Sequence, residues 1–133
     1  METQIDGTRK FRLDNLLPID PPREDALKDI TARYHLLGKF REGYGGLPMV
    51  AVIDGVNYLT DGNQRAIWLA LNGYRTMLAW ANFHETSGTC SKYDRYIEIN
   101  NQFRSRNVHS VVDLAKTVRL PERFIVKRRS KRK

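Results

Sequence analysis

The residues best suited to chemistry lie together at positions 61–65, with the sequence Asp-Gly-Asn-Gln-Arg. They supply a carboxylate, a glycine, two side-chain amides and a guanidinium immediately before the apolar run 66–71. A helix that begins directly after Gly62 leaves its first backbone N–H groups without helical acceptors, and its dipole adds about half a positive charge there. Such a helix start binds anions, most often phosphate, so the stretch predicts an anion site.

Four residues form the predicted phosphate or nucleotide site, namely Gly62, Asn63, Gln64 and Arg65. Gly62 would let a bulky anion approach the backbone, and Arg65 in the first turn would point back over it. Asp61 has two alternative roles: its carboxylate caps the helix, or it holds a Mg²⁺ ion bound to the phosphates. For Arg65 the plainer alternative is a surface ion pair.

Local patterns predict the elements around this turn. Asp54-Gly55, between two β-rich runs, is typical of a hairpin whose turn residues both have positive φ. The helix is apolar on nearly every side, which indicates that it is buried, and Gly73 is a suitable left-handed stop. The predicted elements are strands at 47–53 and 56–60, a helix at about 63–72 and a strand at 76–81.

Upstream of the hairpin, residues 9–13 alternate between polar and apolar side chains and predict a first strand. The prolines that follow block a helix until Pro22 or Arg23, and Asp20 is its expected N-cap. Residues 42–46 are rich in glycine, so they form either a plain connector or a mobile flap over the site.

Beyond the last of these strands the patterns are weaker. Residues 82–92 are polar and small and predict a loop, whereas residues 93–104 fit a helix better than a strand. Ser110 and Asp113 resemble a capping box, with Asp in place of the usual Glu, and this pattern opens a short helix. Residues 124–126 are expected to form either an edge strand or a hydrophobic patch.

The remaining aromatic and titratable residues indicate no second site. Trp68 and Trp80 each lie within an apolar run, so both are predicted to belong to the core rather than to stack on bases. His35, His84 and His109 lack the spacing of metal ligands.

The composition is that of an ordinary folded domain. The chain has 133 residues, 41% hydrophobic and 29% charged, which suits one domain at 1–126 with a core at 9–83 and a helical extension at 84–126. Its apolar runs are too short to span a bilayer, its N-terminus has no apolar signal segment, and Cys90 has no partner for an internal disulfide. These features predict an intracellular, cytoplasmic protein without membrane contact.

The net charge of +8 arises mainly from the C-terminus. Six of the 23 basic residues lie in the tail 127–133, and without them 17 basic residues face 15 acidic ones. A basic tail attracts polyanions, nucleic acid first, although a solubilising end is the alternative. The predicted nucleic-acid contacts are Lys127, Arg128, Arg129, Lys131, Arg132 and Lys133.

A family resemblance rests on the stretch 61–65, the apolar helix after it, Gly73 and the next strand. This order resembles the signature segment of the ParB/sulfiredoxin superfamily, which includes ParB-like N-terminal and ParB-like nuclease domains. The proline-rich residues 18–23, their helix and the hairpin are similar too, so the resemblance covers roughly residues 9–83. It implies an α/β (α+β) fold, a small mixed sheet with flanking helices, whose Gly-x-x-Arg turn binds a nucleotide such as ATP, ADP or CTP.

The chain departs from parts of the family pattern. Sulfiredoxins carry a catalytic cysteine directly after the glycine, where this chain has Asn63, so sulfinic acid reduction is not expected. ParB-type partition proteins use CTP to clamp DNA and carry a second arginine, where this chain has Gln64. They also add a helix-turn-helix domain, whose pattern is missing after Phe83.

Two functions follow as expectations. The first is a nucleotide-phosphate-binding, DNA-associated ParB-like module. The alternative is a Mg²⁺-dependent, nucleotide-using enzyme of the same fold, a small-molecule kinase, NTPase or nuclease, with Asp61 and Glu24 as catalytic residues. The plain role of a helix-start acid is the favoured one for Glu24, and the sequence leaves open whether the protein is an enzyme and which oligomer it forms.

Overall fold

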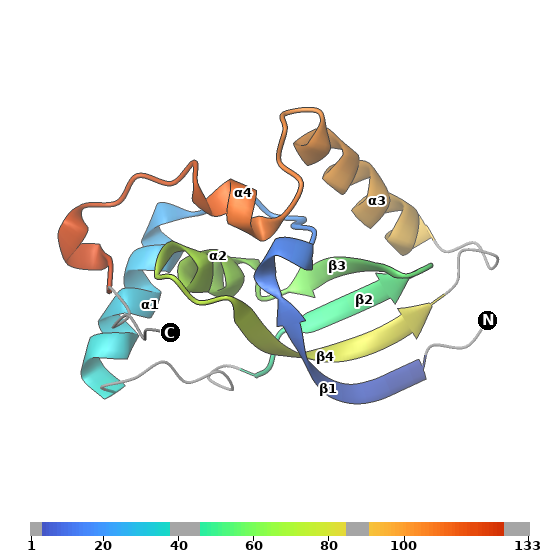
Figure 1. Cartoon of the computed structure of the whole chain (residues 1–133), viewed down its shortest axis with the longest axis horizontal. Helices are drawn as coiled ribbons and strands as arrows, with labels where there is room; N and C mark the ends of the chain where they lie inside the picture. Colours follow the sequence, from blue (N-terminus) through green and yellow to red (C-terminus); the bar gives the residue numbers. More distant parts are fainter. Residues whose placement is uncertain (1–3, 38–45, 85–90, 127–133) are drawn as a thin grey trace.

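A four-stranded mixed sheet flanked by helices forms the fold (Figure 1), which confirms the predicted α+β class. The computed structural model describes residues 4–37, 46–84 and 91–126. The basic tail and most of the glycine-rich loop 42–46 lie outside the described residues. The elements are β1 (Gln4–Arg12), η1 (Leu13–Asn15), α1 (Glu24–Leu37), β2 (Met49–Ile53), β3 (Val56–Asp61), α2 (Asn63–Leu71), β4 (Thr76–His84), α3 (Ser91–Arg104), α4 (Val111–Ala115) and η2 (Glu122–Phe124).

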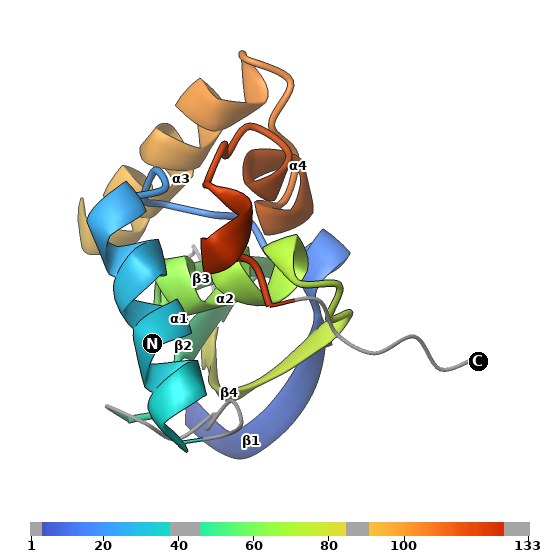
Figure 2. The same ribbon diagram turned by 90° about the vertical axis from the view of Figure 1, so that its left-hand side faces the viewer.

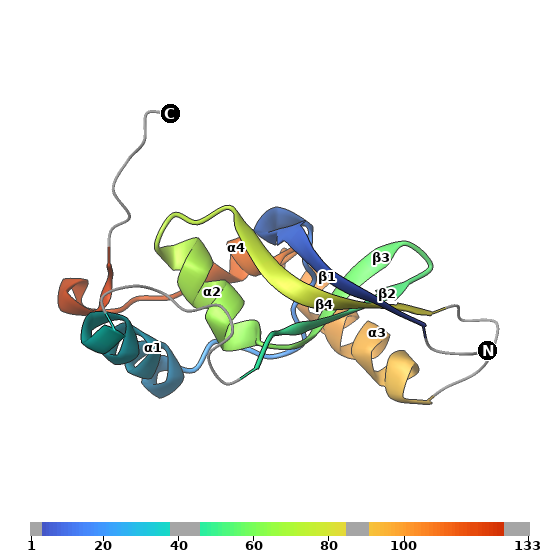
Figure 3. The same cartoon turned by 90° about the horizontal axis from the view of Figure 1, so that it is seen from below.

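The strands follow the order β1-β4-β2-β3. β2 and β3 form the predicted hairpin, and its turn residues Asp54 and Gly55 both have positive φ, 52° and 81°. β2 runs parallel to β4, whereas β1 pairs antiparallel with β4 (Figure 3). The two edges of the sheet are therefore β1 and β3.

Helix α2 is buried on nearly all sides, as its composition predicted. Ile67 and Trp68 are fully buried, and they pack with sheet residues such as Val50, Leu59 and Met77 in the main core. Helix α1 lies beside α2 (Figure 2) and contributes residues to the same core. Within the described part of the chain, no helix combines the length and apolarity that a membrane crossing requires.

Several predicted boundaries shift in the structure. β4 continues to His84 because its last residues still pair with β2, and α3 already begins at Ser91, so the prediction of a loop over residues 82–92 was wrong at both ends. The helix predicted for residues 93–104 is confirmed. Helix α1 begins at Glu24, which is too far along the chain for Asp20 to cap it, so that prediction was wrong. The Asp20 N–H instead donates a hydrogen bond to the side-chain oxygen of Asn63 at 3.4 Å.

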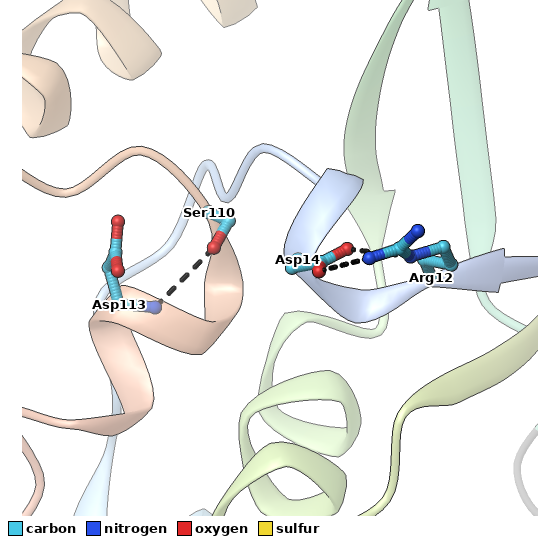
Figure 4. A network of polar contacts seen from close by, with 4 residues as sticks. All are labelled: Arg12, Asp14, Ser110 and Asp113. Carbon is cyan, nitrogen blue, oxygen red and sulfur yellow. Dashed lines mark hydrogen bonds and ion pairs between the residues drawn. The ribbon is translucent and has the colours of Figure 1, made fainter.

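The predicted cap of α4 is confirmed. The Ser110 hydroxyl accepts a hydrogen bond from the Asp113 N–H at 3.4 Å (Figure 4), and the Asp113 carboxylate accepts one from the His109 N–H at 2.9 Å. Because aspartate is shorter than glutamate, the reciprocal bond goes to the residue before the N-cap rather than to the N-cap itself. The helix is short and ends at Ala115.

A buried hydroxyl joins three distant parts of the chain. The Trp68 indole N–H donates to the Thr31 hydroxyl at 2.9 Å, and that hydroxyl donates to the Phe124 carbonyl at 2.7 Å. The Phe124 carbonyl therefore faces α1 rather than a sheet edge, and η2 replaces the edge strand that was one of the two alternatives for residues 124–126.

Replacing Thr31 by valine should remove this link at nearly constant volume. We expect the free energy of unfolding to fall by about 2–3 kcal/mol, since the fully buried indole N–H loses its acceptor. Thr31→Ser keeps the hydroxyl, so its loss of unfolding free energy should be clearly smaller. Denaturant titration of both variants measures the difference, and equal losses would show that the methyl group rather than the hydroxyl matters.

Candidate functional site

The predicted anion site lies at the junction of β3 and α2. Gly62 is the N-cap of α2 and has φ 93°, a conformation that residues with a side chain rarely adopt. A Cβ atom at this position would lie 2.6 Å from Pro48 Cβ, so the proline already occupies that space. The absence of a side chain at Gly62 therefore allows close packing against Pro48.

The side chain of Asn63 is buried and hydrogen-bonded at both ends. Its side-chain oxygen accepts hydrogen bonds from the N–H groups of Ile19 at 3.0 Å and Asp20 at 3.4 Å, and its side-chain nitrogen donates to the Leu59 carbonyl at 2.9 Å. Its exposed fraction is only 3%. The side chain thus fixes the start of α2 to both β3 and the proline-rich segment.

Gln64, the next residue, holds the same segment nearer to the start of α1. Its side-chain oxygen accepts from the Arg23 N–H, and its side-chain nitrogen donates to the Pro21 carbonyl, both at 2.8 Å. The two amides at the start of α2 therefore bind the chain at residues 19–23. Of the predicted ligands Asn63 and Gln64, only the backbone N–H groups remain for an anion.

A third side-chain amide, from α3, binds the same proline-rich segment. The side-chain nitrogen of Asn100, a buried residue of α3, donates to the Pro18 carbonyl at 3.1 Å. No sequence pattern pointed to this role, because an asparagine in a polar helix is usually exposed. Residues 18–23 are consequently held between α2 and α3.

Arg65 is the charged residue of the turn that stays suited to an anion. It is half-buried, and its guanidinium donates to the Gly46 carbonyl, which brings the end of the glycine-rich loop to the start of α2. Burial lowers the pKa of the Arg65 guanidinium, and the Asp61 carboxylate acts in the opposite direction. The side chain nevertheless stays charged, because arginine does not lose its proton in proteins.

The first turn of α2 is electrostatically unlike the others. Each of the other α-helices that the structure describes has an acidic residue in its first turn, whereas α2 has none and carries Arg65 there. A helix N-terminus favours negative charge by about 0.3–1 kcal/mol for an exposed group. Helix α2 instead has the half-buried Arg65 cation at its positive end.

The two candidate catalytic acids lie in different settings. Asp61 is exposed at the end of β3, and α2 has no side-chain cap, so the prediction that Asp61 caps the helix is wrong. Glu24 forms an ion pair with Lys28 at 2.9 Å, one helical turn away, as a plain helix-start acid does. Among the residues with described positions, no three acidic, histidine or cysteine side chains lie close enough to hold a metal ion together.

Comparison with known proteins places the chain in no family. Neither a family model nor a curated protein matches it. A solved structure, that of protein Atu1540 from Agrobacterium tumefaciens, aligns at 15% sequence identity and a TM-score of 0.42. The alignment covers 80% of this chain, which spans half of that protein's length.

Proposed function

We propose that the first turn of α2 binds the phosphate of a nucleotide, and that the chain is a nucleotide-phosphate-binding, DNA-associated module of the ParB-like kind. One observation carries the proposal. The half-buried Arg65 stands at the positive end of α2, in a first turn that has no acidic residue. A bound phosphate would offset both positive charges at once.

The hydrogen bonds of the turn support this function. Asn63 and Gln64 use their side chains to fix the first turn of α2, so its backbone N–H groups are held in place before a ligand arrives. A site that needs no rearrangement loses less entropy on binding. Arg65, fixed by the Gly46 carbonyl, can then add a charge-assisted hydrogen bond.

Titration calorimetry with ATP, ADP, CTP and GTP, with and without Mg²⁺, tests the proposal. We expect at least one nucleotide to bind, and Arg65→Gln to weaken its affinity about 10-fold or more, because a hydrogen bond to a charged group contributes about 1.5–3 kcal/mol. Lys116→Gln, which removes a charge from an exposed residue after α4, is the control and should bind normally. No binding by any nucleotide would refute the proposal.

The tail supplies the second part of the proposed function. We expect DNA affinity to fall steeply with salt, with up to six phosphate contacts from the basic residues of 127–133. Replacing all six by glutamine should remove most of the affinity and flatten the salt dependence, as fluorescence anisotropy with a labelled duplex would show. An unchanged affinity would place the DNA contact elsewhere.

A further inference from the structure

The two faces of the sheet are covered unequally. One face carries Phe11, Val50 and Met77 and packs against the main core. On the other face, Ala51, Ile53 and Tyr58 form a small second core with Ile97 of α3. Figures 1 and 2 show α3 at the β3 side of the sheet and β1 at the opposite edge, so α3 covers the β2–β3 half.

Trp80 lies on the half of this face that α3 does not cover. It is 39% exposed, although it lies on the inner strand β4 and was expected to be core. The register places it beside Thr8 of β1 and Met49 of β2. The other tryptophan, Trp68, is fully buried, so Trp80 supplies the accessible indole of this protein.

Positive charge borders the indole. Lys10 and Arg12 of β1 pair with Leu78 and Thr76 of β4, on the same face as Trp80. Lys10 is exposed, whereas Arg12 is bonded to Asp14 at 2.7 Å (Figure 4). Asp6 precedes Thr8 by two residues in β1, and Asp61, which pairs with Met49, lies two strands from Trp80.

We infer that this open face, defined by Trp80, Leu78, Thr8, Lys10 and Arg12, binds single-stranded nucleic acid. A base would stack on the Trp80 indole, and Lys10 would contact the phosphate backbone. Charges on an edge strand also prevent sheet-to-sheet pairing, but that role does not require a large aromatic side chain exposed on the neighbouring strand. The paired bases of a duplex cannot reach the indole, which favours a single strand over a duplex. This surface shares no residue with the phosphate turn.

Tryptophan fluorescence gives a direct test with the full chain. Titration with a 20-nucleotide oligothymidine should quench the emission of Trp80 saturably, and a duplex of the same length should quench it far less. Anisotropy of a labelled oligothymidine should show that Trp80→Leu weakens binding about 10-fold, whereas Trp80→Phe retains more of the affinity because it keeps an aromatic ring. With all tail cations replaced by glutamine, the quenching should remain, at higher oligonucleotide concentration.

Charge reversal supplies the matched control. Lys10→Glu should weaken oligothymidine binding. It should also reduce the slope of log affinity against log salt concentration by about the amount that one phosphate contact contributes. Lys116→Glu changes the net charge equally, at the end of α4, which packs against α2, and it should weaken binding much less. The inference is overturned if Trp80 is not quenched, if both reversals act alike, or if sedimentation shows that the Trp80 face instead joins two copies of the chain.

Discussion

Gly62→Ala should lower the free energy of unfolding by about 3 kcal/mol. Two costs add. A left-handed conformation costs a residue with a side chain about 1–2 kcal/mol. In addition, the new Cβ would lie 2.6 Å from Pro48 Cβ, and overpacking of this kind costs about 1–3 kcal/mol.

Gly73→Ala is a matched control for this variant. Gly73 also has positive φ, 84°, but a Cβ there meets no atom within 4 Å. Its substitution should cost only about 1 kcal/mol, since the conformational penalty is partly offset by the reduced entropy of the unfolded chain. Equal losses in denaturant titrations of the two variants would contradict the close packing of Gly62 against Pro48.

Asn63→Leu should destabilise the protein by about 3–4 kcal/mol. The side chain has nearly the same size, but the Ile19 N–H and the Leu59 carbonyl lose their partners in a buried place. Each buried polar group left unsatisfied costs about 1–3 kcal/mol. Thermal or denaturant unfolding measures the loss.

Two further variants separate the bonds of Asn63 from general damage to the turn. Gln64→Leu removes two bonds of similar length at a more exposed position, so it should cost only about 1 kcal/mol. Asn63→Asp keeps the acceptor for the Ile19 N–H but loses the donor to the Leu59 carbonyl. Its loss of unfolding free energy should lie between those of Asn63→Leu and Gln64→Leu. If Asn63→Leu lost no more unfolding free energy than Gln64→Leu, burial of the Asn63 hydrogen bonds would add nothing to stability.

The sequence was sufficient where local rules act alone. The hairpin at Asp54-Gly55 follows from turn chemistry, and the buried character of α2 follows from its uniform apolarity. The order strand, turn, helix, strand around position 62 could be read in the same way, and it placed Arg65 in the first turn of a helix. These features depend on residues close together in the chain.

The partners of the amides could not be predicted in this way. Apart from the bond of Asn63 to the Leu59 carbonyl, the side chains of Asn63, Gln64 and Asn100 bond to residues 41 to 82 positions away. Nothing in the neighbouring sequence distinguishes such an amide from one that binds a ligand or water. Residue types alone therefore indicated an anion site at this turn, but not that the side chains of Asn63 and Gln64 hold residues 19–23.

Trp80 shows a signal that the sequence did contain. Met77, Ala79 and Ala81 alternate with Leu78 and Trp80, so a period of two separates a buried face from one that carries the indole. That pattern assigns Trp80 to the second face of the sheet. It does not reveal that α3 covers only the β2–β3 half, which depends on how the helix packs.

The most direct test of the phosphate site is to follow the backbone amides of α2 by NMR while the nucleotide that binds in calorimetry is added. The amide signals of Gln64 and Arg65 should shift saturably with the affinity found by calorimetry, and the shifts should disappear in Arg65→Gln while the rest of the spectrum stays folded. Saturable shifts elsewhere, with those two amides unmoved, would show that the nucleotide binds at another place and that the first turn of α2 is not the site.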